Sequence, residues 1–235
     1  MKTIAGIFAV LLIVLFLIFP FVAFSATGTV GLQSNYLWRG TTFSDNKAVV
    51  QASGEASVGK GFYLGTFVSN ATMLDDSRDH MTHEVDAIIG KRFIKDDLIV
   101  DIYHNHYFFP NAGVYDTHET TAQIQYKKSL ISFSQMDDFF GYGTIYRYVR
   151  AGQSFEYKPG LEGALLIGFN TFEKQKKAGN TDYFDVLFVN KKTLTDGSYF
   201  NAMINYTNRQ LYSDSGKEQA KDLMFIVGYT IPFEI

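Results

Sequence analysis

The stretch GTVGLQSNYLWRGTTFSDNKAVVQASGE, residues 28–55, decides the fold. Its two ends alternate between apolar and polar residues, and they flank TTFSDNK at 41–47, a polar segment rich in turn-forming residues. The apolar parity contains Val30, Leu32, Tyr36, Trp38, Val50, Ala52 and Ala56. The polar parity contains Thr29, Gln33, Asn35, Arg39, Gln51, Ser53 and Glu55. This pattern predicts a β-hairpin with one apolar face and one polar face.

The N-terminus indicates what kind of hairpin this is. Residues 1–25 carry one charge, Lys2, followed by an apolar run at 4–24 and then small side chains suited to a signal peptidase. We therefore expect residues 1–25 to be a signal peptide cleaved near Ala26. The run is long enough to cross a bilayer, so an uncleaved anchor is the alternative.

The remaining residues, 26–235, form one predicted domain. After Ser25 no apolar stretch approaches the roughly 18 residues of a membrane helix, so a membrane-spanning mature chain must be a closed β-barrel. Alternating segments of roughly ten residues recur to the end, which predicts an all-β, antiparallel outer-membrane barrel of about twelve strands. Aromatic residues are 16% of the chain, as expected for a barrel with aromatic girdles.

The predicted connections alternate in length. Short connections fall at 57–61, 91–97, 127–129, 158–160 and 190–198. Polar and mostly longer connections fall at 40–47, 71–80, 110–116, 138–143, 173–181 and 210–221. Short periplasmic turns on one rim and longer outer loops on the other are typical of bacterial outer-membrane barrels.

The polar parity predicts the lining of the lumen. The lumen-facing candidates are Gln33, Asn35, Arg39, Gln51, Glu55, Glu84, Asp86, Asp101, Glu119, Arg150 and Arg209. Carboxylates outnumber arginines along this face, which favours weak cation selectivity. The outer loops are short, so we expect little material to fold inward and favour a narrow channel over a plugged barrel. If the polar parity instead faces solvent, the chain is a soluble barrel or sandwich.

Aromatic residues near the predicted outer rim suggest contact with the membrane interface. We interpret Tyr36, Trp38, Tyr107 and Phe108 as membrane-interface aromatics. Small residues on the apolar parity leave room for side-by-side packing of barrels, and a ring of barrels could enclose lipid. These residues are Ala52, Ala56, Ala122 and Ala202.

Histidines are the strongest candidates for a metal-binding or titratable site. His83, His104, His106 and His118 lie near the outer ends of three consecutive predicted strands. They could bind a metal ion or titrate as a patch, but the simpler interpretation places them at the membrane interface. No cofactor is expected. The weakest hypothesis is a hydrolase that pairs His104 with Ser132 or Ser134. The sequence contains no Gly-x-Ser-x-Gly motif, so we expect no enzyme activity.

Four stretches resemble the TorF family of proteobacterial porins. They are SNYLWRGTTFSDNKAVVQ (34–51), GFYLGTFVSN (61–70), HEVDAIIGKRF (83–93) and DLIVDIYHNHYFFPNA (97–112). The resemblance is strongest over residues 34–119, and it implies an outer-membrane β-barrel without catalytic residues.

The functional expectation is a porin-like barrel in a Gram-negative outer membrane that passes small solutes or ions. The alternative is a non-conducting barrel that forms homo-oligomers, organises or encloses membrane lipid, or presents loops to a partner. The formal charge of -3 becomes -4 without Lys2, so no basic patch suggests nucleic acid. Cysteine is absent from the chain, which excludes disulfides and thiolate chemistry.

Overall fold

The structure is a computed structural model that describes residues 25–73, 81–174, 181–213, 216–219 and 223–234. The predicted signal peptide therefore lies outside the described residues, apart from Ser25. No helix within the described ranges is long and apolar enough to span a bilayer.

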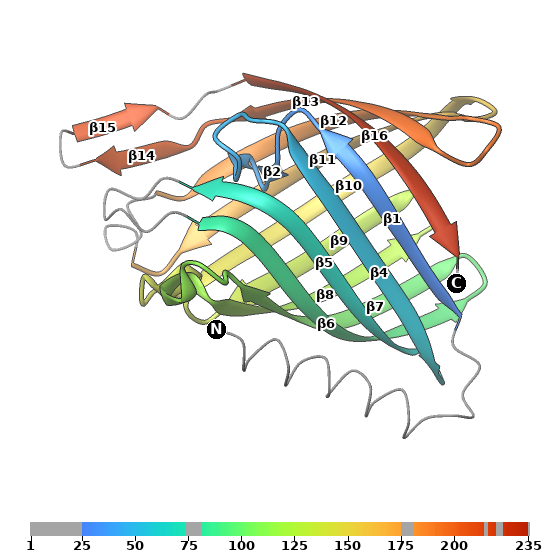
Figure 1. Ribbon diagram of the computed structural model, residues 1–235, viewed down its shortest axis with the longest axis horizontal. Helices are drawn as coiled ribbons and strands as arrows, with labels where there is room; N and C mark the ends of the chain where they lie inside the picture. Colours follow the sequence, from blue (N-terminus) through green and yellow to red (C-terminus); the bar gives the residue numbers. More distant parts are fainter. Residues whose placement is uncertain (1–24, 74–80, 175–180, 214–215, 220–222, 235) are drawn as a thin grey trace.

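Within these ranges twelve antiparallel strands form one closed barrel (Figure 1). The wall consists of β1 (Ala26–Gln33), β4 (Val49–Gly59), β5 (Phe62–Met73), β6 (Met81–Lys95), β7 (Leu98–Phe108), β8 (Thr117–Tyr126), β9 (Ser129–Met136), β10 (Tyr146–Lys158), β11 (Leu161–Phe172), β12 (Tyr183–Thr193), β13 (Tyr199–Thr207) and β16 (Leu223–Glu234). Neighbours in the wall are neighbours in sequence, and β1 closes the barrel by pairing with both β4 and β16. The predicted twelve-stranded antiparallel barrel is confirmed.

The two faces of the wall differ in polarity as the alternation predicts. Outward side chains such as Leu32, Ile89 and Phe225 are 59%, 57% and 69% exposed. Inward side chains such as Glu84 and Asn205 are at most 1% exposed. The interior of this barrel is thus polar and its exterior apolar, the arrangement of a barrel that faces lipid. The soluble alternative, which requires the opposite arrangement, is wrong.

The two rims also follow the predicted alternation. The short-turn rim carries tight connections, and several are turns of two residues between strands, such as Lys60-Gly61, Asp96-Asp97 and Lys127-Lys128. Lys60, Asp96 and Lys127 adopt positive φ values of 54°, 51° and 53°, as two-residue hairpin turns require. This rim and the C-terminal end of the wall lie at the right of Figure 1.

In the described part of the long-loop rim, two short ribbons and two 3-10 turns lie between wall strands. They are the ribbon β2 (Leu37–Trp38) with β3 (Thr41–Thr42), the ribbon β14 (Gln210–Ser213) with β15 (Gly216–Gln219), and the 3-10 turns η1 (Gly113–Tyr115) and η2 (Phe139–Gly141). The ribbon β2–β3 belongs to the first long loop, residues 34–48. This loop determines the shape of the lumen.

Candidate functional site: the lumen and its plug

The first long loop folds inward and forms a plug, which we define as residues 34–48. The wall strand β1 ends at Gln33, and the chain then makes the tight β2–β3 ribbon through Arg39 and Gly40, whose φ values are 48° and 78°. A Cβ atom at position 40 would lie 2.8 Å from Cβ of Asp185 on β12. Glycine is therefore required here both by the backbone conformation and by the close approach of the plug to the far wall.

Asn35 organises the base of the plug. Its side-chain oxygen accepts hydrogen bonds from the hydroxyls of Thr42 at 2.6 Å and Ser44 at 2.9 Å. The Ser44 hydroxyl in turn accepts from the backbone N–H of Tyr36 at 2.9 Å. These bonds tie the two ends of the loop together, so the plug is an ordered element with its own internal hydrogen bonds.

A buried aromatic cluster fills the long-loop end of the barrel. Its centre is Trp38, which stacks on Phe43 with ring centroids 5.0 Å apart and meets Phe140 of the η2 turn edge-on at 5.4 Å. The cluster also contains Tyr36, Tyr107, Phe109, Tyr115, Phe139, Tyr146, Tyr148, Phe172 and Tyr183. Side chains from three loops and from the inner faces of β7, β10, β11 and β12 thus pack together, and they close this end of the lumen.

An ion pair fastens the plug to the wall. The guanidinium of Arg39 meets the carboxylate of Glu119 on β8, with Nη1 to Oε2 at 2.6 Å and Nη2 donating to Oε1 at 2.7 Å. The side chains are 13% and 2% exposed. The same guanidinium lies 4.5 Å from the ring centroid of Tyr148 and 4.6 Å from that of Trp38. This ion pair, with aromatic rings next to its guanidinium, connects the tip of the plug to the wall.

Two tyrosine hydroxyls add further bonds between plug and wall. Tyr36 of the plug donates to Oε1 of Glu84 on β6 at 3.0 Å, and Tyr183 on β12 donates to the backbone carbonyl of Arg39 at 3.0 Å. Burial, and then the nearby Glu84 carboxylate, raise the pKa of Tyr36 well above its ordinary value of 10.0. The phenol therefore stays protonated and remains a donor to Glu84.

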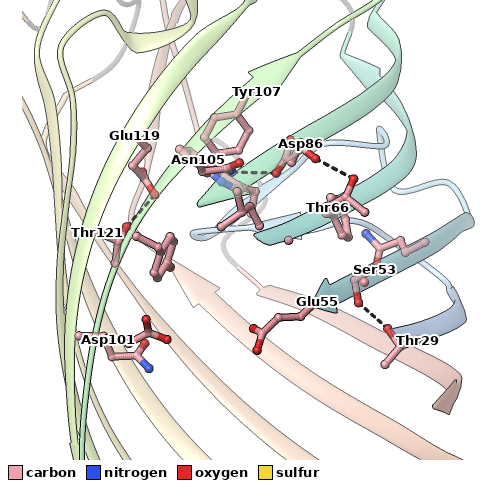
Figure 2. Close-up of a pocket in the computed structure, with 18 of the residues that line it drawn as sticks. Thr29, Ser53, Glu55, Thr66, Asp86, Asp101, Asn105, Tyr107, Glu119 and Thr121 are labelled. Carbon is pink, nitrogen blue, oxygen red and sulfur yellow. Dashed lines mark hydrogen bonds between the residues drawn. The ribbon is translucent and has the colours of Figure 1, made fainter. Parts of the chain in front are cut away.

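Below the plug lies a cavity of about 890 Å³. Its lining runs from Thr27 and Glu234, near the short-turn rim, to Trp38 and Arg39 of the plug. Figure 2 shows polar side chains of the wall along this cavity, among them Asp86, Asn105 and Glu119. The cavity is thus polar and extends from the short-turn rim to the plug.

The structure brings most of the predicted lumen residues together. Nine of the eleven predicted lumen residues line the cavity, namely Gln33, Asn35, Arg39, Gln51, Glu55, Asp86, Asp101, Glu119 and Arg150. Glu84 faces inward but is buried beneath Tyr36. Arg209 lies beside the plug, where Nη1 donates to the Thr41 hydroxyl and the guanidinium lies 5.5 Å from the ring centroid of Tyr183.

Arg92 is a lumen residue that sequence reasoning missed. Its guanidinium bonds both carboxylate oxygens of Glu55 on β4, at 2.8 and 3.0 Å, and Oδ2 of Asp101 on β7 at 2.9 Å. The sequence pattern predicts a connection at 91–97, whereas β6 continues to Lys95. The parity that Arg92 shares with Glu84 and Asp86 was the signal that could have found it.

The interpretation of Tyr36, Trp38 and Tyr107 as membrane-interface aromatics is wrong. These side chains are 8%, 9% and 6% exposed and belong to the interior aromatic cluster. The chain leaves the wall after Gln33, so the parity of β1 no longer points Tyr36 and Trp38 outward, and Tyr107 shares the inward parity of Asp101. Phe108 does face outward, stacked on His106 at 4.0 Å.

The expectation that little material would fold inward is also wrong. The plug is short, but it is rich in large side chains, and η2 contributes Phe139 and Phe140 from a second loop. A few aromatic rings are enough to fill the mouth of a barrel of this size.

The histidines lie on the outward face. His104, His106 and His118 share a parity with outward Ile102 and Ile124, and the rings of His104 and His118 lie 5.4 Å apart. In the part of the chain that the structure describes, no group of three or more His, Cys, Asp and Glu side chains is placed to hold a metal ion. His83 instead bonds the neighbouring Thr82 hydroxyl at 2.8 Å.

The hydrolase hypothesis has no geometric support. His104 is exposed on the outside of β7, whereas Ser132 and Ser134 are 7% and 2% exposed and point inward from β9. The wall separates the imidazole from both hydroxyls, so neither pair can act as base and nucleophile.

Two solved structures are similar to this chain in fold. The NanC porin has a TM-score of 0.54 and 10% identity, with 88% of this chain and 97% of that chain covered. A structure described as "Unveiling the Mechanism Behind the in-meso Crystallization of Membrane Proteins" has a TM-score of 0.55 and 8% identity, covering 90% and 84%. No curated protein sequence matches the chain. The fold is therefore that of outer-membrane porins.

A family model also matches the sequence over residues 20–223. None of the comparisons carries the TorF name, so membership of the TorF family stays a prediction. The match covers most of the chain, including eleven of the twelve wall strands completely. The chain belongs to the family described as "Bacterial protein of unknown function (Gcw_chp)".

Proposed function

We propose that this protein is an outer-membrane channel for small, polar, preferentially cationic solutes, and that its plug closes the channel at the outer face. The observation that carries this proposal is the cavity of about 890 Å³, which ends on a loop and not on the wall. Short turns face the periplasm in barrels of this class, so the cavity would open to the periplasm. Movement of one loop would then complete a path across the membrane.

The charges along the cavity favour cations. Its lining contains the carboxylates of Glu55, Asp86, Asp101, Glu119 and Glu234 and the guanidinium groups of Arg39, Arg92 and Arg150. The excess of carboxylates gives the lumen a negative potential, and acidic lumen rings attract cations.

Arg150 provides a test of this selectivity. Nε of Arg150 is buried and has no hydrogen-bond partner among the residues that the structure describes, and the side chain lines the cavity. We expect Arg150→Gln to increase the preference for K⁺ over Cl⁻, because it removes a positive charge from the lumen. The measurement is the reversal potential in a KCl gradient, recorded in planar bilayers with the plug-opening variant Trp38→Ala as background. An anion-preferring parent channel, or an unchanged reversal potential, would contradict the proposed selectivity.

The second candidate function is a non-conducting barrel, and the packed plug favours it. In this alternative the aromatic cluster closes the barrel permanently and the protein acts through its surface. Bilayer recordings separate the two functions. Stepwise conductance from the folded Trp38→Ala protein supports the gated channel. A Trp38→Ala protein that is folded and inserted in the bilayer but does not conduct supports the closed barrel.

We also propose that barrels associate side by side in the membrane. Ala122 and Ala202 are exposed on the outward face, and small side chains let neighbouring walls approach closely. We expect native mass spectrometry from mild detergent to show homo-oligomers with retained lipid, and Ala122→Trp with Ala202→Trp to shift them toward monomers. A population of delipidated monomers alone would contradict this prediction.

A further inference from the structure

A groove of about 390 Å³ lies at the short-turn rim, beside the hairpin of β6 and β7. It arises because neighbouring hairpins differ in length. Strand β5 pairs with β6 only as far as Lys91, whereas β6 and β7 stay paired as far as Lys95. Residues 92–95 therefore extend past the β4–β5 turn at Lys60-Gly61, and the groove occupies this step. We call it the rim groove.

The rim groove is lined largely by apolar side chains. They are Phe93, Ile94, Leu98 and Val100, of which the first three are 49%, 69% and 38% exposed. Phe93 shares the parity of outward Ile89 on β6, and Leu98 and Val100 share that of outward Ile102 on β7. The rim groove therefore opens on the side of the wall that faces lipid.

Lysines supply the charge of the rim groove. Lys60 and Lys95 are exposed and belong to its lining. Lys91 lies next to the groove, with Nζ 5.0 Å from the ring centroid of Phe93. Within the described residues, no ion pair reaches any of these three lysines. The rim groove thus combines an apolar lining with positive charge that no described carboxylate compensates.

The neighbouring charged residues do not change this balance. Asp96 and Asp97 form the adjacent turn, but neither belongs to the described lining or pairs with a described lysine. Arg92 also contacts the groove, but Glu55 and Asp101 in the lumen hold its guanidinium. The described lining itself contains no carboxylate.

A second groove at the same rim has a different balance of charge. It measures about 280 Å³ and contains Lys128 and Lys191 together with Glu156 and Glu162. Nζ of Lys191 lies 2.7 Å from Oε2 of Glu162. The two lysines of this groove are matched by two carboxylates, whereas those of the rim groove are not. An anionic ligand is therefore expected at the rim groove and not at the second groove.

We propose that the rim groove binds a phospholipid with an anionic headgroup from the periplasmic leaflet. Lysine ammonium groups bind phosphate, and lysines at a membrane surface attract anionic lipids. In the bound state, Lys60 and Lys95 contact the headgroup, and an acyl chain covers Phe93 and Leu98. A free phosphate ion would use the lysines but would leave the apolar lining uncovered, so the lining favours a lipid.

The experiment is native mass spectrometry of the full mature chain, delipidated in detergent and titrated with phosphatidylglycerol or with phosphatidylcholine of the same acyl chains. We expect one phosphatidylglycerol per chain to bind at least about tenfold more tightly than phosphatidylcholine. Combined Lys60→Gln and Lys95→Gln should abolish this preference. The matched control, Lys158→Gln with Lys192→Gln, removes two exposed lysines from the same rim on β10 and β12, and should keep the preference within about twofold.

Glycerol 1-phosphate distinguishes a lipid from a free phosphate. This probe carries the phosphate group without acyl chains, so a large excess should leave phosphatidylglycerol bound to the parent protein. Displacement of the lipid by this probe would show a site for phosphate alone and would overturn the proposal.

Folding of all variants is checked by the mobility of unboiled protein on SDS gels. Equal affinity of the parent for the two lipids would overturn the proposal, as would an unchanged preference in the folded Lys60→Gln, Lys95→Gln protein. An equal loss of preference in the control would assign the effect to the charge of the whole rim and would also contradict the groove. The rim groove lies outside the lumen, so these outcomes leave the conductance expected of Trp38→Ala unchanged.

Discussion

Replacing Trp38 by alanine should convert a closed barrel into a conducting one. Trp38 contacts Phe43, Phe140 and Tyr146 with ring centroids 5.0, 5.4 and 5.6 Å away, and it stacks beneath the Arg39 guanidinium. Loss of a buried Trp removes about 3–5 kcal/mol of packing, and the plug makes these contacts only when it is docked. The equilibrium between open and closed plug should therefore shift toward the open state by roughly 10²- to 10⁴-fold.

The measurement is single-channel open probability in planar bilayers. The matched control is Phe225→Ala, which removes a large aromatic side chain from the outward face of β16, where it is 69% exposed. That control should keep the closed behaviour of the parent. Equal open probabilities for Trp38→Ala and Phe225→Ala, with both proteins folded, would show that Trp38 does not hold the plug.

Breaking the Arg39–Glu119 pair should release the plug by a separate route. Glu119→Gln conserves the shape of the side chain but leaves the Arg39 guanidinium, 13% exposed, without its carboxylate. Removal of one partner of a buried ion pair costs about 3–5 kcal/mol, because the other charge stays buried and uncompensated. We expect Glu119→Gln to raise the open probability strongly and to expose the plug to protease.

A double-mutant cycle isolates this pair from general destabilisation. Arg39→Gln combined with Glu119→Gln should be less open than the sum of the single changes, with a coupling free energy of about 1–3 kcal/mol. Asp101→Asn is the control, since it breaks a wall pair with Arg92 at 2.9 Å that does not touch the plug. Additive effects of the two substitutions would exclude the ion pair as a latch.

The barrel itself could be predicted from the sequence because its physical signal is local. A wall between lipid and a polar lumen imposes an alternation of period two, as at Val30, Leu32 and Gln33, and each two-residue turn needs a residue that tolerates positive φ. Both signals are visible in any single strand. Twelve strands and the two kinds of rim follow from repeating them along the chain.

The plug could not be predicted from the same alternation. Tyr36 and Trp38 keep the parity of Leu32, although the chain has already left the wall and folded into the lumen. The only local signal for this departure is Arg39-Gly40, a two-residue turn between Leu37–Trp38 and Thr41–Thr42. Alternation reports that a side of the chain is apolar, but not whether lipid or other aromatic rings cover it.

The ion pairs could not be predicted from the sequence either. Arg39 and Glu119 are 80 residues apart, and Arg92 and Glu55 are 37 residues apart. Such pairs depend on the closure and register of the whole barrel, which a single sequence does not reveal.

Fluorescence quenching of Trp38, the single tryptophan of the chain, reports directly whether the plug is docked in the lumen. In the folded parent protein, reconstituted in bilayers, we expect blue-shifted emission that neither acrylamide in water nor brominated lipid quenches appreciably. Acrylamide should gain access in Glu119→Gln, where the plug is released. Strong quenching of the parent by brominated lipid would place Trp38 at the membrane interface and would contradict the plug.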